Sequence, residues 1–179
     1  YRAAIDGDKG TAAARAAADA GLAGVIIHLY TDPNGDGNPA DGLMIRTNLT
    51  DGGGYFLVTA SAAGLLNIVE SAPYGVTKHA AVAFAEWLAI AYGRRGLRVS
   101  CLCPQAVITG MYKGDGGSAG VDGALTAEQV AGEIVKVMGE ERFLVLPHPT
   151  VLDYMRNKSA DYDRWIGGMQ KLFTQYQQR

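Results

Sequence analysis

The sequence has only two cysteines and three histidines among its 179 residues, and its net charge of −2 is close to zero. Cys101 and Cys103 lie two apart on a predicted strand and point to the same face, where disulfide geometry is rarely satisfied. His28, His79 and His148 show no metal-ligand spacing, so we expect no metal site. A near-neutral chain also argues against a nucleic-acid-binding surface. These features predict buried, reduced thiols in a cytoplasmic protein.

The sequence also has no uninterrupted apolar run that approaches the roughly 18 residues of a membrane span. Its most apolar segment, residues 80–92, is broken by Glu86, and the start of the chain shows no signal-peptide pattern. With 48% hydrophobic residues, the chain can build a sizeable core. We therefore expect one soluble α/β domain over residues 1–179, with no membrane and no nucleic acid as partner.

The most informative residues present are Tyr74 and Lys78, which lie four apart, with Ser61 thirteen residues before the tyrosine. A helix is predicted here, because Ser71 is a candidate N-cap and Pro73 falls in the first turn. Residues i and i+4 share one helix face, so the ammonium of Lys78 favours the phenolate form of Tyr74. Such a tyrosine can exchange a proton with an alcohol or carbonyl oxygen.

Two buried strands are predicted on either side of this helix, over residues 55–59 and 97–103. Strand–helix–strand units are parallel, and their ligands bind beyond the carboxyl ends of the strands. Ser61 and Pro104 follow the two strands, so both are expected at that edge. Glycines at positions 93 and 96 end the helix, and apolar residues at helical spacing predict one inward face, formed by Val76, Ala80, Phe84, Trp87, Leu88 and Ala91.

Together these motifs resemble the short-chain dehydrogenase/reductase family. The resemblance is carried by residues 59–66, by Tyr-Gly-Val-Thr-Lys over residues 74–78 and by Pro-Gln-Ala-Val-Ile-Thr over residues 104–109. It spans the last two thirds of the chain. It implies a Rossmann-like, doubly wound parallel sheet with helices on both faces. It also implies an NAD(P)-dependent oxidoreductase that interconverts a secondary alcohol and a ketone by hydride transfer.

The resemblance assigns a role to each matching position. Tyr74 would be the general acid/base, and Ser61 would hydrogen-bond the substrate oxygen. Lys78 would hold the nicotinamide ribose, and Asn48 resembles the asparagine that anchors a proton relay behind the lysine. The cofactor contacts implied besides Tyr74 and Lys78 are Pro104, Gln105, Val107 and Thr109.

The sequence departs from the family pattern in three places. Gln105 stands where the family usually has glycine. No glycine-rich phosphate-binding loop occurs, and the chain opens at what resembles the second strand, followed by an alanine-rich helical stretch over residues 11–20. Only twelve residues separate Asn48 from Ser61, too few for a strand and the family's helix of about 11 residues. We interpret the sequence as joined parts of a longer chain rather than as a truncated relic unable to bind a dinucleotide.

The choice between NAD and NADP depends on the end of the predicted second strand. Asp6 at that position favours NAD, but a shift in alignment places Ala4 there instead. Two alternatives to the dehydrogenase interpretation stay open. One is an epimerase or dehydratase of the extended branch, and the other is a non-catalytic Rossmann-like binding protein.

The C-terminal third completes the predicted domain. The glycine-rich segment 114–124 reads as a substrate lid. Thr126 and Gln129 form a capping box that opens a helix with Val130, Ile134, Val135 and Met138 facing inward. A strand over residues 142–146 and a helical tail follow. For the aromatic residues of the tail, packing against the sheet is the default expectation, and an apolar substrate pocket or a subunit contact are the alternatives. The resemblance also implies a homo-oligomer, a dimer or tetramer.

Overall fold

The computed structural model describes residues 2–5, 26–30, 44–49, 54–110, 112 and 117–177. The chain divides into two compact units. The first contains Tyr1–Phe56 and Leu88–Val99, and the second contains Leu57–Trp87 and Ser100–Arg179.

An antiparallel sheet forms in the first unit. It consists of β1 (Arg2–Ile5), β2 (Ile26–Tyr30) and β3 (Met44–Leu49), in that order. The resemblance leads one to expect parallel strands here. Antiparallel neighbours that follow one another in sequence need no crossover helix, whereas parallel ones do. The predicted helix over residues 11–20, Asp6 and the junction after Thr50 lie outside the described residues.

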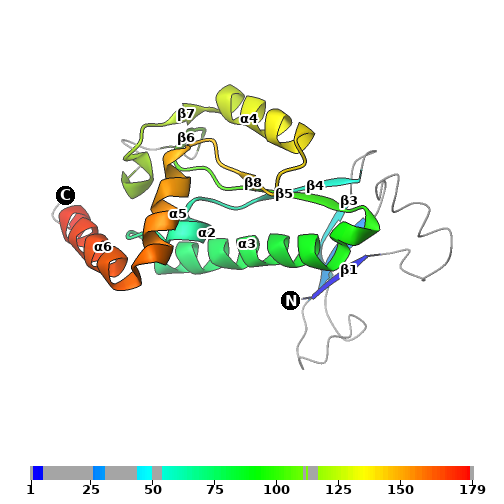
Figure 1. Ribbon diagram of the computed structural model, residues 1–179, viewed down its shortest axis with the longest axis horizontal. Helices are drawn as coiled ribbons and strands as arrows, with labels where there is room; N and C mark the ends of the chain where they lie inside the picture. The colour runs from blue at the N-terminus through cyan, green and yellow to red at the C-terminus, as the bar shows by residue number, and fades with distance from the viewer. Residues whose placement is uncertain are drawn as a thin grey trace. The chain divides into compact units, whose positions relative to one another are not determined.

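The predicted strand–helix–strand unit is confirmed. β4 (Tyr55–Thr59) and β5 (Arg98–Leu102) are joined through α2 (Ala63–Leu66) and α3 (Ala72–Tyr92) (Figure 1). The sheet continues to β8 (Leu144–Val145), in the order β4-β5-β8, and β5 and β8 are parallel. This parallel sheet with helices gives the doubly wound α/β class expected from the sequence.

Helix α3 begins and ends where the sequence predicts. The Ser71 Oγ accepts a hydrogen bond from the Tyr74 N–H at 3.4 Å, as an N-cap does. After α3, a 3-10 turn (η2, Gly93–Arg95) closes on Gly96, whose φ of 88° is in the left-handed region that suits glycine.

The predicted inward face of α3 is partly wrong. Val76 and Trp87 are exposed, whereas the buried side chains include Val82, Ala85 and Leu88. Leu88 is the one member of the predicted set that is fully buried. The helix carries apolar residues on all sides, so the spacing of apolar residues did not decide which side faces the core.

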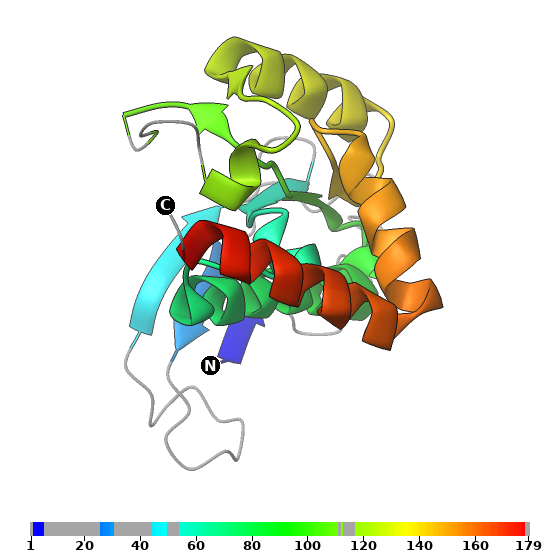
Figure 2. The same ribbon diagram turned by 90° about the vertical axis from the view of Figure 1, so that its left-hand side faces the viewer.

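The second unit also contains a small parallel pair, β6 (Val107–Ile108) with β7 (Leu125–Thr126), and a 3-10 turn, η3 (Gly117–Gly120). Three further helices follow. They are α4 (Ala127–Gly139), α5 (Thr150–Ala160) and α6 (Tyr162–Gln177). Helix α4 packs on β6, β7 and β8, and α5 contacts α2 and α6 (Figures 1 and 2).

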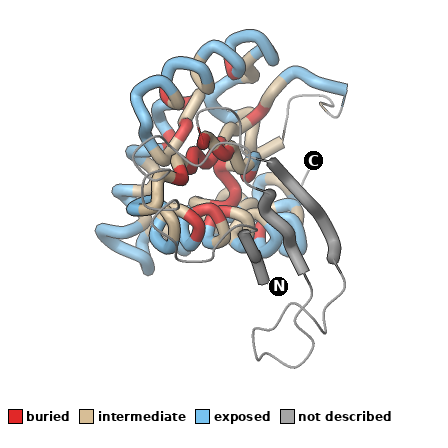
Figure 3. The backbone as a smooth tube through the Cα atoms, turned by 90° about the vertical axis from the view of Figure 1, so that its right-hand side faces the viewer, coloured by how far each residue is buried: buried red, intermediate tan, exposed pale blue. Residues whose placement is uncertain are grey.

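Two apolar clusters hold the second unit together. Figure 3 shows the buried residues of the chain in red. The first joins β5, α4 and β8 through Leu102, Val130, Val137 and Val145, and the second joins α2 to α5 through Ala62, Leu66 and Val151.

The capping box of Thr126 and Gln129 is present, as predicted. Val130 is buried, but Val135, expected to face inward, is 73% exposed, and Val137 takes the buried place instead.

Both cysteines are free and fully buried, as the sequence predicts, with the two Sγ atoms 3.7 Å apart. The hydrogen bond with Cys103, together with burial, raises the pKa of Cys101, so that thiol stays protonated. Within the described ranges, no helix combines the length and apolar character needed to cross a membrane.

Candidate active site

The segments that follow β4 and β5 are tied together at the carboxyl edge of the sheet. The Ala60 N–H donates to the Leu102 carbonyl at 2.9 Å, and the Ala62 N–H donates to the Pro104 carbonyl at 2.8 Å. Between them, the Ser61 Oγ accepts from the Ala63 N–H at 3.2 Å and donates to the Pro104 carbonyl at 3.4 Å. Ser61 is therefore held at the edge where open α/β sheets bind their ligands.

Tyr74 and Lys78 project from the first turns of α3. The Lys78 Nζ lies 5.5 Å from the centre of the Tyr74 ring, so the predicted pairing on one helix face is present. The Tyr74 side chain is 41% exposed, which leaves its phenol accessible to a ligand.

Two cavities adjoin these residues, and we call them the first and second cavity. The first has a volume of about 670 Å³ and the second about 580 Å³. Both volumes are in the range of small-molecule and cofactor sites. Ser61, Tyr74 and Gln105 line both cavities and so form their common wall.

The remaining residues of the predicted site in this unit line the second cavity. Lys78, Pro104, Val107 and Thr109 all line it, together with residues of α4. The turn after β5 therefore lies beside the Tyr74/Lys78 pair, as the resemblance implies.

The first cavity is mostly apolar. Tyr154 from α5 and Trp165 from α6 line it, so two of the C-terminal aromatics border a pocket, whereas Tyr162 and Phe173 are exposed. Its other apolar lining side chains include Leu66, Ile68, Val121, Met169 and Leu172.

Hydrogen bonds from two other segments hold the described part of the predicted lid in place. The carboxylate of Glu70 accepts hydrogen bonds from the Ser118 N–H and, at 2.6 Å, from the Ser118 hydroxyl. The Ala106 N–H donates to the Ala119 carbonyl at 3.0 Å. Ser118 and Ala119 also line the first cavity, so η3 contributes to its wall.

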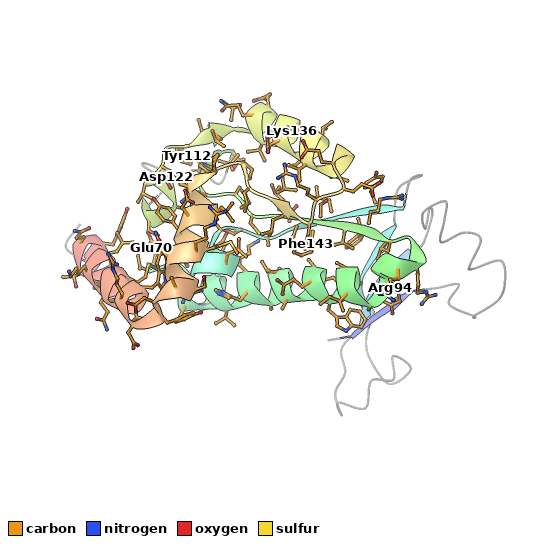
Figure 4. All side chains as sticks on the ribbon, viewed as in Figure 1. Glu70, Arg94, Tyr112, Asp122, Lys136 and Phe143 are labelled. Carbon is orange, nitrogen blue, oxygen red and sulfur yellow. The ribbon has the colours of Figure 1, made fainter. Side chains whose placement is uncertain are left out.

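The carboxylate of Asp122 is the centre of a hydrogen-bond network. Asp122 accepts from the Thr150 hydroxyl at 2.8 Å and from the Tyr154 hydroxyl at 3.1 Å; Figure 4 labels both Asp122 and Glu70. Partial burial acts to raise the pKa of Asp122, but hydrogen bonds from Gln105, Thr150 and Tyr154 outweigh it and hold the pKa below its ordinary value. Asp122 is therefore ionised at neutral pH.

This network distinguishes the two tyrosines of the first cavity. Burial and the hydrogen bond to Asp122 raise the pKa of Tyr154, so Tyr154 stays a neutral donor. Tyr74 has Lys78 beside it instead of a carboxylate. Of these two phenols, Tyr74 is therefore the one beside a cation and Tyr154 the one beside a carboxylate.

Of the residues predicted for the site, the second unit brings together Ser61, Tyr74, Lys78 and the turn from Pro104 to Thr109. Asn48 lies in β3 of the first unit, where its backbone pairs with Ile27, and its relay role stays a prediction. Among the residues that the structure describes, no group of three His, Cys, Asp or Glu side chains could hold a metal ion.

The sequence did not point to Glu70, Asp122 or Thr150. The hydrogen bonds Glu70–Ser118, Asp122–Thr150 and Asp122–Tyr154 join residues 48, 28 and 32 positions apart, and no short motif links them. The one signal was that Asp122 is a carboxylate inside a glycine-rich segment.

Comparison with known proteins identifies the family. The family described as enoyl-(acyl carrier protein) reductase matches residues 43–140, which is more than half of the chain. The chain belongs to the short-chain dehydrogenase/reductase family.

Similar proteins include a 1-deoxy-11-beta-hydroxypentalenate dehydrogenase of Streptomyces exfoliatus, which is 32% identical over 63% of this chain and 42% of that protein. A borneol dehydrogenase of Lavandula x intermedia is 32% identical over 60% of this chain and 44% of its own length. The chain thus spans less than half of the length of either relative. A solved short-chain dehydrogenase from Novosphingobium aromaticivorans aligns with a TM-score of 0.48 at 22% identity, over 63% of this chain and 36% of that one.

Proposed function

We propose that this short-chain dehydrogenase/reductase interconverts a secondary alcohol and a ketone with a nicotinamide cofactor. The observation that carries the proposal is the wall that the two cavities share. An oxygen atom of a substrate in the first cavity can contact Ser61 and Tyr74 from one side. A cofactor in the second cavity reaches the same wall from the other side.

The second cavity fits the nicotinamide and ribose part of such a cofactor. Lys78 supplies a cation that can donate to ribose hydroxyls, and the turn from Pro104 to Thr109 provides one wall. The cofactor, when bound, supplies the hydride. We propose NAD rather than NADP on the basis of Asp6 in the sequence.

The protein's own contribution is to place and move a proton at the substrate oxygen. During ketone reduction that oxygen becomes negatively charged. The Ser61 hydroxyl, which donates to the Pro104 carbonyl in this structure, turns its single proton to the substrate oxygen and stabilises the charge. The Tyr74 hydroxyl gives its proton to the same oxygen. The ammonium of Lys78 stabilises the phenolate left behind. Alcohol oxidation uses the same groups in reverse.

The first cavity indicates the kind of substrate. A volume of about 670 Å³ with a mainly apolar lining suits a bulky, largely hydrocarbon alcohol or ketone. Apolar side chains from α2, η3 and α6 would bury the skeleton, leaving the reacting oxygen at Ser61 and Tyr74.

We also propose that the protein is a homo-oligomer, a dimer or tetramer. Val76 and Trp87 are 69% and 44% exposed on α3, and Ala80 and Ala83 lie exposed between them. The four positions are spaced by four, three and four residues, as in a helix seam that packs against another helix. Such an apolar stripe supports a subunit contact.

The test combines cofactor binding with turnover. Titration with NADH and NADPH, followed by fluorescence, measures binding, and Tyr74→Phe should lower ketone reduction by about 10²–10⁴-fold while leaving that binding intact. Tyr162→Phe is the matched control, because Tyr162 is exposed and lines neither cavity. Undiminished turnover by Tyr74→Phe would remove Tyr74 from its role. Cofactor binding without any turnover would favour a non-catalytic binding protein.

A further inference from the structure

The walls of the first cavity are held in two different ways. The wall formed by α2 and α5 is anchored in the core, because Leu66 packs with Val151, and the Lys158 Nζ donates to the Leu65 carbonyl at 2.7 Å. The wall formed by η3 has no such anchor. None of its four residues is buried, and none belongs to the two apolar clusters of this unit. The position of η3 therefore depends on its polar contacts.

Glu70, in the loop between α2 and α3, makes the polar contact at the start of η3. Its carboxylate accepts from the Ser118 N–H and, at 2.6 Å, from the Ser118 hydroxyl. Ile68 and Ser71, close to Glu70 in the chain, line the first cavity, as do Ser118 and Ala119. Glu70 itself lines neither cavity. Its carboxylate thus joins two segments of one cavity wall without entering the cavity.

Gly117 shows that η3 is shaped for this contact. Its φ of 59° is in the left-handed region that favours glycine. A Cβ atom at this position would also lie 2.7 Å from the Glu70 Oε1. Any other residue would strain the backbone and push the carboxylate away from Ser118. Glycine at position 117 therefore permits both the turn and the close approach of Glu70.

Loss of the Glu70 contact would free only one end of η3. The Ala106 N–H still donates to the Ala119 carbonyl at 3.0 Å, which holds the other end. On its other side η3 contacts α6, whose Met169 and Leu172 line the same cavity. A displaced η3 would therefore open the apolar wall of the first cavity and reduce the area that a ligand buries there.

We propose that Glu70 is a positioning residue for substrate binding. By holding Ser118, it keeps η3 where the first cavity fits a bulky, mainly apolar ketone or alcohol. It acts through η3 and touches neither substrate nor cofactor. This inference rests on the proposed function, which assigns the first cavity to the substrate.

The experiment measures the binding of benzophenone, a bulky apolar ketone. Binding is followed by the fluorescence of Trp165, which lines the first cavity. The chain has two tryptophans, so Trp87→Phe provides a parent in which Trp165 alone reports. Glu70→Ala in this parent should weaken benzophenone binding by about 10-fold. Hydrogen bonds to a charged group are strong, and affinity falls with the fraction of molecules in which η3 is in place.

Glu70→Gln should give an intermediate affinity. Its amide oxygen can still accept from the Ser118 N–H, and its NH₂ group can donate to the Ser118 hydroxyl, but the charge is lost. This graded order separates positioning through hydrogen bonds from a general loosening of the fold. Glu133→Ala and Glu133→Gln on α4 are the matched controls, because Glu133 lines neither cavity, and both should keep the parent's affinity.

Unchanged benzophenone affinity in Glu70→Ala would overturn the inference, and so would an equal loss in Glu133→Ala. Glu70→Gln binding as weakly as Glu70→Ala, or a parent that does not bind benzophenone, would also overturn it. These readouts need no turnover. Failure of the proposed function would instead appear as undiminished ketone reduction by Tyr74→Phe, so the two failures are distinguishable.

Discussion

Gly64 in α2 packs directly against the backbone of Lys78 in α3. A Cβ atom at position 64 would lie 2.5 Å from the Lys78 carbonyl oxygen and 2.8 Å from the Val82 Cγ2. Real Cβ atoms do not approach backbone that closely. The short helix after Ser61 therefore reaches the helix of Tyr74 and Lys78 only because position 64 has no side chain.

Gly64→Ala should separate α2 from α3 and so displace Ser61 relative to Tyr74. We expect an overpacking cost of about 1–3 kcal/mol in the free energy of unfolding, measured by urea denaturation, together with lower ketone reduction. Gly132→Ala is the control. Nothing lies within 4 Å of a Cβ there, and the site is inside α4, so it should stabilise the protein by about 0.5–1 kcal/mol. Equal stability of the two variants would refute the close-packing interpretation.

Removing the cap of α3 should weaken the element that carries Tyr74. Ser71→Ala deletes the oxygen that accepts from the Tyr74 N–H, and we expect it to cost about 1 kcal/mol of unfolding free energy. Ser71→Asp keeps a capping oxygen and should retain most of the stability. If both variants melt at the wild-type temperature, Ser71 contributes nothing as a cap.

The contact between Glu70 and Ser118 should control local opening of η3 rather than global stability. Glu70→Ala removes both hydrogen bonds, and bonds to a charged group contribute about 1.5–3 kcal/mol, so amide exchange over residues 117–120 should accelerate by about 10-fold or more. Glu133→Ala, which breaks an ion pair with Lys136 on the surface of α4, should leave that exchange unchanged. Hydrogen exchange read by mass spectrometry would detect the difference, and identical exchange in both variants would show that η3 is held by other contacts.

His148 should make the protein less stable under mildly acidic conditions. Burial lowers the pKa of His148 below its ordinary value of 6.5, although Gly123 and Asp122 act in the opposite direction. The unfolded chain therefore takes up a proton near pH 6.5 before the folded chain does. The free energy of unfolding should fall as pH drops from about 6.5 toward the lower folded pKa, with a slope of up to about 1.4 kcal/mol per pH unit.

Chemical denaturation at a series of pH values would measure this slope, and His148→Gln should flatten it. The loss due to Asp122 belongs to a separate window below pH 3.8, because the pKa of this carboxyl is depressed. A wild-type curve that stays flat between pH 6.5 and 5 would contradict the assignment of His148 as a buried neutral group.

Local chemistry made much of this structure predictable. The ends of helices could be predicted from short segments, because the residues that cap them hydrogen-bond to backbone groups a few positions away. These residues are Ser71, Gly96 and the pair Thr126 and Gln129. The family motifs likewise placed Ser61 and Tyr74 on one cavity wall.

The features that the sequence did not predict correctly depend on contacts between residues far apart in the chain. On α3, Val76 and Trp87 are as apolar as Val82 and Leu88, and only the neighbouring elements determine which pair is buried. The Asp122 network joins α5 to a loop 28 and 32 residues earlier. Nothing in a single sequence indicates such pairings.

The shared wall of the two cavities also has a thermodynamic consequence. Ser61, Tyr74 and Gln105 line both cavities, so a ligand on one side that shifts any of them would change the free energy of binding on the other side. Linkage requires this effect to be reciprocal: the factor by which a ligand in one cavity alters affinity in the other equals the factor in the opposite direction. Ordered or cooperative binding would then follow from three side chains, without movement of a domain.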